Sequence, residues 1–304
     1  MAKALETPSL DCNDTATKAA ALVLNTRFDE MVGFRGEASL PDNVDGVHDM
    51  RVASRRFRSL LRDLARLFDK KLVKPIRKDA KFLADALGRV RDEDVYLEAL
   101  SQLAEKSPNE ALKMDIETLA ATRSAARSKE YQDLLPSISP GSVTQLTGKL
   151  KALTSGAETG KEKKGSFRDE GCSIISRSLK KFIDRAASLY EPLNSEALHK
   201  LRISAKRLRY ALELFDVCFN GELKRFAKMV KKLQSQLGAI HDRDSWIEQI
   251  GNEIADGRID AETAEWLISE MLQTRGEAYN EALSLWNDWK GSDQTCQLTA
   301  ILNN

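Results

Sequence analysis

The sequence predicts an all-α protein built from two similar helical bundles. Of its 304 residues, 31% are charged and only 6% are aromatic, and long stretches without proline carry apolar residues at helical spacing. Two separate blocks of the first half return in the second half, in the same order. Length, periodicity and repetition together predict two four-helix bundles related by pseudo-two-fold symmetry.

The repetition has nearly the same offset at both places. Val47 to Arg58 (VHDMRVASRRFR) and Leu198 to Arg209 (LHKLRISAKRLR) lie 151 residues apart, and each has a histidine, then Arg at +3, then basic residues at +7, +8 and +10. Further along, three lysines, a Leu-Gly pair and two aspartates recur 150 residues later. They are Lys74, Lys78, Lys81, Leu87, Gly88, Asp92 and Asp94, and then Lys224, Lys228, Lys231, Leu237, Gly238, Asp242 and Asp244. A shared offset indicates an internal duplication.

In the first half, residues 14–153, the helices follow a polar N-terminus at 1–13 that we expect to be disordered. Periodicity predicts a lead helix at 15–32, a loop at 33–46, and a basic helix from 47 onward with Asp45 as its candidate N-cap. A lysine-rich helix at 69–86 leads through a turn at 87–94 into another at 95–103. A further helix is predicted at 110–134, and Pro136, Pro140 and Gly141 then interrupt the pattern.

The second half repeats this order after a linker at 154–166, which is rich in glycine and lysine. Within 167–290 we predict helices at 172–189, 195–219, 223–237, 246–254 and 261–289, with a turn at 238–244. Asn194 or Ser195 is the candidate cap of the second basic helix, and Asn220-Gly221 ends it. Residues 291–304 are expected to be a polar C-terminal tail.

The positive charge of this nearly neutral chain is concentrated in the repeated blocks. Residues 47–91 contain 14 Lys or Arg against 5 Asp or Glu, and residues 198–243 contain 11 against 4, whereas the whole chain has a net charge of +1. Like charges at i, i+4 destabilise a helix by about 0.2–0.5 kcal/mol per pair. Because this cost recurs in both halves, we interpret the basic residues as a ligand-binding site. Their positive electrostatic field indicates that the ligand is a polyanion.

The candidate ligand-binding residues are the basic residues of the two blocks. Those of the first half are His48, Arg51, Arg55, Arg56, Arg58, Lys74, Arg77, Lys78, Lys81 and Arg91. Those of the second half are His199, Arg202, Lys206, Arg207, Arg209, Lys224, Lys228 and Lys231. Arginine binds phosphate oxygens in a bidentate manner, and lysine supplies a mobile point charge.

These blocks, with their lysine rows and their Leu-Gly to Asp-x-Asp segments, resemble the CHAD domain, the histidine-containing α-helical domain, over about residues 15–290. The resemblance implies two four-helix bundles with a basic groove or pore, and binding of inorganic polyphosphate, often at polyphosphate granules or with granule-associated proteins. The Glu-x-Glu-x-Lys motif of the CYTH triphosphatase domain, often fused to CHAD domains, is missing. One departure is that Arg91 is replaced by His241 in the second copy, which makes the basic role there weaker or dependent on pH.

Two other functions are alternatives to polyphosphate binding. A metal-dependent phosphohydrolase would use Asp92, Asp94, Asp242 and Asp244, but helix capping and orientation of nearby basic residues explain them too. Because the sequence has no evident nucleophile and no glycine-rich phosphate loop, we expect no enzyme and no cofactor. The other alternative is a basic scaffold for nucleic acid or acidic proteins. The basic stripes contain few aromatic residues, which disfavours single-stranded nucleic acid, and Trp246, Trp266, Trp286 and Trp289 are expected to pack in the core or an interface.

No metal, disulfide framework or membrane partner is expected. The chain has three histidines without an H-x3-H pair, and Arg51 and Arg55, close to His48 along the same helix, would repel a cation. Its four cysteines are widely spaced, which argues against a zinc site and a disulfide framework. The N-terminus has no signal-peptide pattern, and the apolar runs are too short to span a bilayer. A cytoplasmic location is therefore the expectation.

Overall fold

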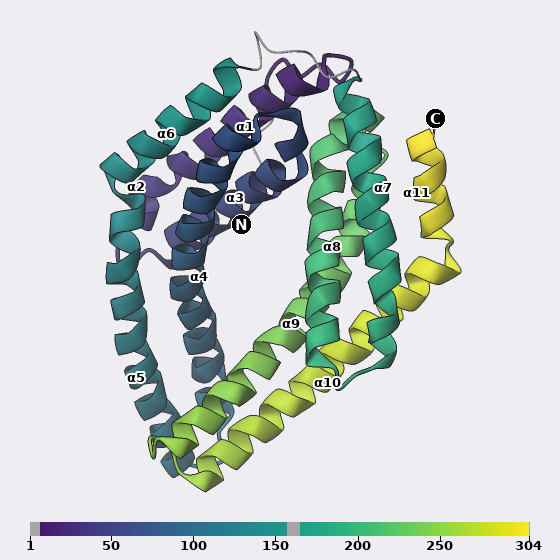
Figure 1. Ribbon diagram of the computed structural model, residues 1–304. Coiled ribbons are helices and arrows are strands. Elements are labelled where there is room, and N and C mark those ends of the chain that lie inside the picture. Colours follow the sequence, from purple (N-terminus) through teal and green to yellow (C-terminus); the bar gives the residue numbers. More distant parts are fainter. Residues whose placement is uncertain (1–6, 157–164, 304) are drawn as a thin grey trace. The chain divides into compact units, whose positions relative to one another are not determined.

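The computed structural model describes residues 7–156 and 165–303. In these ranges the regular structure is helical, and a single isolated bridge joins Thr15 to Ser166 (Figure 1). The protein is therefore all-α, as predicted. The chain divides into two compact units, Met1–Phe167 and Arg168–Asn304. Residues 1–6 of the predicted disordered N-terminus and residues 157–164 of the predicted linker lie outside the described residues, and the pseudo-two-fold relation stays a prediction.

The first unit contains six α-helices in its described part. They are α1 (Ala16–Gly33), α2 (Arg35–Ala38), α3 (Val44–Asp63), α4 (Lys70–Lys106), α5 (Glu110–Leu134) and α6 (Pro140–Ser155), with 3₁₀ turns at Ala65–Leu67 and Leu135–Ile138. α3 packs between α1 and α4, and α4 also packs against α5 and α6. The predicted apolar stripe of α3 is buried, and the Phe28 and Phe57 rings lie 5.5 Å apart in the core.

The predicted loop at 33–46 was wrong in part, because it contains α2 and the start of α3. Asn43, and not Asp45, caps α3, since its side chain accepts a hydrogen bond from the backbone N–H of Gly46 at 2.9 Å. A Cβ atom at position 46 would lie 2.5 Å from the backbone carbonyl carbon of Glu37. Glycine is therefore what allows α2 and α3 to approach each other closely.

The largest correction concerns the predicted turns at 87–94 and 238–244, because the helices continue through both segments. α4 runs unbroken to Lys106, and in the second unit α9 (Lys224–Ala255) does the same. A glycine inside a helix costs about 1 kcal/mol relative to alanine. The guanidinium of Arg51 lies against Gly88, 3.8 Å from where a Cβ would be, and that of Arg202 lies 3.7 Å from the equivalent point at Gly238. Packing along these long helices outweighs the glycine penalty.

The prolines after α5 start a helix, which the sequence analysis missed. Pro140 occupies the first turn of α6, where the missing N–H is tolerated. The side chain of Ser139 caps this helix by accepting a hydrogen bond from the N–H of Ser142 at 3.3 Å. The chain therefore turns back at 135–139 and covers α1 and α4.

The second unit contains α7 (Phe167–Arg185), α8 (Ser195–Phe215), α9, α10 (Ala261–Gly291) and α11 (Gln294–Asn303), with 3₁₀ turns at Ala186–Tyr190 and Asp216–Phe219. Asn194 caps α8 as one of the two predicted candidates, and Asn220 and Gly221 end the segment with φ of 52° and 85°. α9 packs against α8 and α10. The predicted C-terminal tail contains α11, which buries Leu298 and Leu302.

Two of the cysteines are bonded in a way that the sequence spacing did not predict. Cys218, which is buried after α8, is disulfide-bonded, whereas Cys172 and Cys296 are free thiols. In the first unit, Cys12 is also disulfide-bonded. No helix in the described ranges is long and apolar enough to cross a membrane.

Candidate anion-binding site

α3 places four of the candidate side chains along one face of the first unit. His48, Arg51, Arg55 and Arg58 follow one another at steps of three or four residues, and each is half-buried. The pKa of Arg58 is lowered, mainly by burial and also by the positive charges of Arg55 and Arg62, although Asp85 opposes this change. The arginines are thus close enough to repel one another, which an anion between them would relieve.

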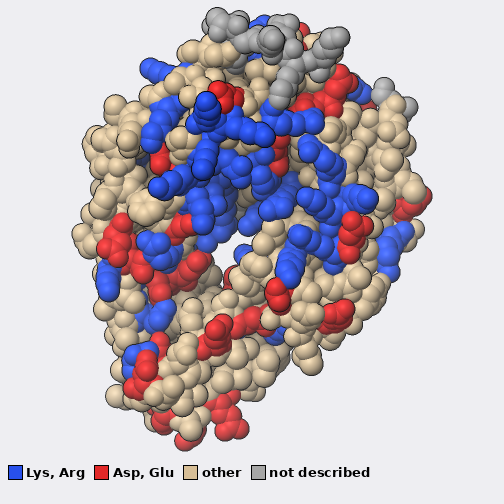
Figure 2. All heavy atoms as spheres, in the orientation of Figure 1, with Lys and Arg blue, Asp and Glu red and all other residues tan. Residues whose placement is uncertain are grey.

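The first half of α4 adds an exposed basic row beside this strip. Lys74, Arg77, Lys78 and Lys81 are exposed, and α4 packs directly on α3. Lys81 lies 4.0 Å from Asp85, but no carboxylate of the described residues forms an ion pair with Arg55, Lys74, Arg77 or Lys78. Figure 2 shows Lys and Arg gathered over α3 and the upper part of α4, whereas the lower parts of α4 and α5 carry both signs of charge.

The middle of α4 completes the cluster around the first histidine. Arg51 donates a hydrogen bond to Asp92 at 2.7 Å, which fixes the guanidinium while Asp92 itself is exposed. Burial, followed by the charge of Arg91, lowers the pKa of His48. His48, Arg51, Arg91 and Asp92 therefore form one group that spans α3 and α4.

The second unit repeats the arrangement, with a longer distance between the equivalent arginine and aspartate. His199, Arg202, Lys206 and Arg209 are half-buried on α8, and Lys224, Lys228 and Lys231 are exposed on α9. The distance from Arg202 to Asp242 is 4.0 Å, and Lys224 lies 3.8 Å from Asp216. In the described residues Lys228 and Lys231 have no carboxylate at ion-pair distance. Arg209 contacts Glu213 at 3.4 Å and lies over the Tyr210 ring.

In this unit a histidine pair takes the place of His48 and Arg91. The Nδ1 atoms of His199 and His241 are 3.2 Å apart, so one ring must donate and the other accept. Burial lowers the pKa of His241 to about 4, with further contributions from Arg202 and His199. Burial and then Arg202 and Lys206 lower the pKa of His199. Without an anion nearby the pair is therefore neutral at pH 7.

A deeper layer of ion pairs holds α4 and α9 in register with the next helix. Asp94, which is buried, accepts a hydrogen bond from Arg127 of α5 at 2.9 Å, and Arg127 also donates to the carbonyl of Pro41. In the second unit Arg275 of α10 donates to Asp244 at 2.6 Å and to the carbonyl of Pro192. The suggestion that these aspartates cap helices was wrong, because they lie in mid-helix. They orient arginines instead.

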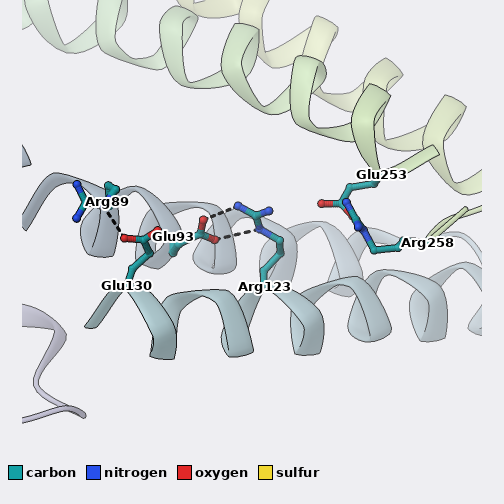
Figure 3. Close-up of polar contacts among 6 residues, drawn as sticks. All are labelled: Arg89, Glu93, Arg123, Glu130, Glu253 and Arg258. Carbon is teal, nitrogen blue, oxygen red and sulfur yellow. Dashed lines mark hydrogen bonds and ion pairs between the residues drawn. The ribbon is translucent and has the colours of Figure 1, made fainter. Parts of the chain in front are cut away.

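Other ion pairs lie further along the same helices. Arg123 pairs with Glu93, and Arg89 donates to Glu130 at 2.6 Å, so that α4 and α5 are linked at successive turns (Figure 3). Burial raises the pKa of Glu93, against the opposing effect of Arg123. Sequence reasoning missed Arg127 and Arg275, although a signal was present: each is followed four residues later by a tyrosine, Tyr131 or Tyr279. Those hydroxyls donate to the carbonyls of Ala38 and Leu189.

Arg56 does not join the strip, although its neighbours do. It donates to Glu30 of α1 at 2.5 Å, and Glu30 is almost completely buried and also paired with Arg27 at 2.8 Å. Its role is therefore to neutralise a buried carboxylate. Arg207, the equivalent residue, is half-buried on α8. The tryptophans Trp246, Trp286 and Trp289 are buried, as expected for core packing, whereas Trp266 is only half-buried.

No group of three or more potential metal ligands occurs among the described residues. The two units thus present the same set of features: a histidine, a strip of half-buried arginines or lysines, and an exposed lysine row. The CHAD domain family model matches residues 23–251. The chain belongs to the CHAD domain family.

Two solved structures are similar to this CHAD protein across nearly its whole length. A crystal structure of the CHAD domain from the plant Ricinus communis has a TM-score of 0.68 and 21% sequence identity, and the match covers 90% of each chain. PptA from Streptomyces chartreusis has the same TM-score with 14% identity, and the match covers 91% of this chain and 100% of that one. No curated protein matches the sequence. At these identities the two structures support the fold alone.

Proposed function

We propose that this CHAD protein binds inorganic polyphosphate through the basic residues of α3 and α4 and of α8 and α9, without hydrolysing it. The observation that carries the proposal is the repeated set of cations without local partners. Among the described residues Arg55, Lys74 and Lys78 of the first unit form no ion pair, and the same holds for Lys228 and Lys231 of the second. Unpaired cations of one sign, held on rigid helices, favour a ligand of repeating negative charge.

The geometry also fits an unbranched chain of phosphates better than a compact anion. At 1.5 Å rise per residue, the strip from His48 to Arg58 extends along roughly 15 Å of helix. Half-buried arginines offer bidentate contacts to phosphate oxygens, and the exposed lysines add mobile charge beside them. The strips contain few aromatic side chains that could stack on nucleic-acid bases, so the arrangement favours a ligand without bases.

The test compares binding of long-chain polyphosphate with binding of duplex DNA at physiological salt. Arg51→Ala combined with Arg202→Ala should weaken polyphosphate binding roughly tenfold or more, because each loses a charged hydrogen-bond donor. A double variant that removes two exposed cations elsewhere, Lys129→Ala with Lys180→Ala, is the matched control and should bind nearly as the parent. Preference for DNA, or equal binding by both double variants, would contradict the proposal.

Two further measurements separate the alternatives. Release of orthophosphate from polyphosphate or a triphosphate in the presence of Mg²⁺ or Mn²⁺ would show a phosphohydrolase, and we expect none above background. Pull-down of proteins or nucleic acid that survives exopolyphosphatase treatment would show a scaffold. In cells, we expect the protein at polyphosphate granules, and removal of polyphosphate should disperse it.

A further inference from the structure

The first unit contains a cavity of about 490 Å³ between α1, α3, α4 and α6. Buried apolar side chains line it, including Phe28, Met31, Met50 and Leu146. Phe82 of α4 also lines it, although 65% of this side chain is exposed to solvent. This volume lies within the usual range for small-molecule sites, about 300–1,000 Å³.

The second unit shows what fills the same place. The residues equivalent to Met31, Asp79 and Leu83 are Phe182, Met229 and Leu233, and these line a cavity of only about 100 Å³. The difference is made by Trp289, which also lines that smaller cavity. Its ring packs edge-on at 5.6 Å from Phe182 and at 6.3 Å from Phe226.

The difference has a local cause in the chain. Counted from Arg127 and Arg275, which make the same contacts, the position of Trp289 corresponds to Gly141. α10 continues straight through this region, whereas the first unit turns back at Pro136 and starts α6 at Pro140. No indole therefore enters the cavity of the first unit. Protein interiors normally leave few voids of this size, so an unfilled apolar cavity next to solvent indicates a ligand site.

Two lysines, Lys78 and Lys81, and two aspartates line this cavity, and the aspartates are offset by cations outside the lining. Of its two aspartates, Asp79 pairs with Lys149 at 2.6 Å and Asp85 lies 3.5 Å from Arg58. Lys78 also lines the cavity, and no carboxylate of the described residues pairs with it. The hydroxyl of Ser137 is buried there without a hydrogen-bond partner in the described part of the chain. Such a group is destabilising until something bonds to it.

We infer that this cavity binds a small amphipathic anion, with an acyl or aryl body and a carboxylate or phosphate group. The apolar body takes the place that Trp289 fills in the second unit, and covers part of Phe82. The anionic group pairs with Lys78, and Ser137 is a hydrogen-bond donor for a ligand oxygen. The inference shares Lys78 with the proposed polyphosphate site, but it rests on the apolar lining and does not depend on polyphosphate binding.

Calorimetric titration of the full chain with decanoate, decyl phosphate and neutral decanol tests this site. We expect one site per chain for the two anions, and weaker binding of decanol. Ser137→Leu introduces the residue found at the equivalent position 285 and fills part of the cavity, so it should reduce affinity about tenfold or more. Lys78→Gln should reduce it about threefold. Lys71→Gln, an exposed lysine of α4 outside the cavity, should not change it.

Val143→Phe fills the cavity from α6 and keeps the test decisive if Ser137→Leu fails to fold. Thermal unfolding gives a second readout, since decanoate should raise the Tm of the parent and not that of a filled variant. Absence of binding by both anions overturns the inference. Unchanged affinity in the filled variants also overturns it. So does an affinity that Lys71→Gln lowers as much as Lys78→Gln, because either result places the ligand elsewhere.

Discussion

At the scale of single residues, the two units differ most at the position next to the first histidine of each strip. His48 faces the permanent charge of Arg91, whereas His199 contacts the neutral imidazole of His241. Of the charged groups around His241, Arg202 and Lys206 disfavour its protonation, and Asp244 favours it, though less strongly than Arg202 disfavours it. The second unit therefore carries a group whose charge depends on pH where the first carries a fixed one.

This difference predicts that the folded protein becomes less stable as the pH falls. His241 has a pKa of about 4 in the folded protein, below its ordinary value of 6.5, so between these values the unfolded chain binds a proton that the folded chain does not. Stability is therefore lost as pH falls through this window. After allowance for solvent screening, His241→Gln should remove about 1 kcal/mol of the loss between pH 7 and pH 5. Urea unfolding at several pH values measures it, and parallel profiles of parent and variant would contradict it.

Which basic residues face the ligand could be predicted only in part at this scale. Arg55 and Arg56 are neighbours, and helical spacing assigns Arg55 to the strip. Arg56 has the same side chain, but its charge is used by Glu30, a buried residue on another helix. The position of α1 relative to α3 decides this, and local periodicity contains no information about it.

At the scale of elements, the long α4 and α9 depend on arginines from the following helix. Arg127 and Asp94 are both nearly buried, whereas Arg89 and Glu130 form an exposed pair at the same α4–α5 interface. Arg127→Met would leave the Asp94 carboxylate buried without its partner, which should destabilise the protein by about 3 kcal/mol.

The matched control is Arg89→Met, which removes an exposed pair and should cost less than about 1 kcal/mol. Chemical denaturation midpoints compare the two variants on the same interface. Equal losses would show that burial of Asp94 does not set the strength of this contact.

The helix boundaries show where local signals fail. The end at Asn220-Gly221 was confirmed, because a left-handed residue stops a helix whatever surrounds it. Gly88 and Gly238 were predicted as turns, since their cost is local. Tertiary contacts offset this helix cost: α5 and Arg51 pack near Gly88, and α10 and Arg202 pack near Gly238. These contacts were not visible in the sequence.

At the scale of the whole molecule, the two repeated blocks put two basic sets on one chain. The charge count, net +9 for 47–91 and net +7 for 198–243, already indicated this from the sequence. The family followed from the same repeated residues, because their order and spacing are long-range features that need no knowledge of packing.

The proposed function then predicts an affinity that depends on polyphosphate length. A chain long enough to engage both basic sets binds its second set at high effective concentration, so its apparent affinity can exceed that of tripolyphosphate by a factor of about 10² or more. Arg55→Ala with Lys78→Ala, which weakens the first set alone, should remove most of this length dependence while binding of tripolyphosphate to the second set remains. Lys206→Ala with Lys228→Ala weakens the second set alone, and should likewise remove most of the length dependence while tripolyphosphate still binds to the first set.

Competition of labelled long-chain polyphosphate with unlabelled chains of graded length, at equal phosphate concentration, measures this dependence. Polyphosphate that engages both sets should bind one per protein, and the length dependence should disappear when either set is lost. If one pair of substitutions abolished all binding and the other had no effect, a single unit would hold the ligand. The basic set of the other unit would then have a structural role only, because its helices and ion pairs would be kept although it binds no polyphosphate.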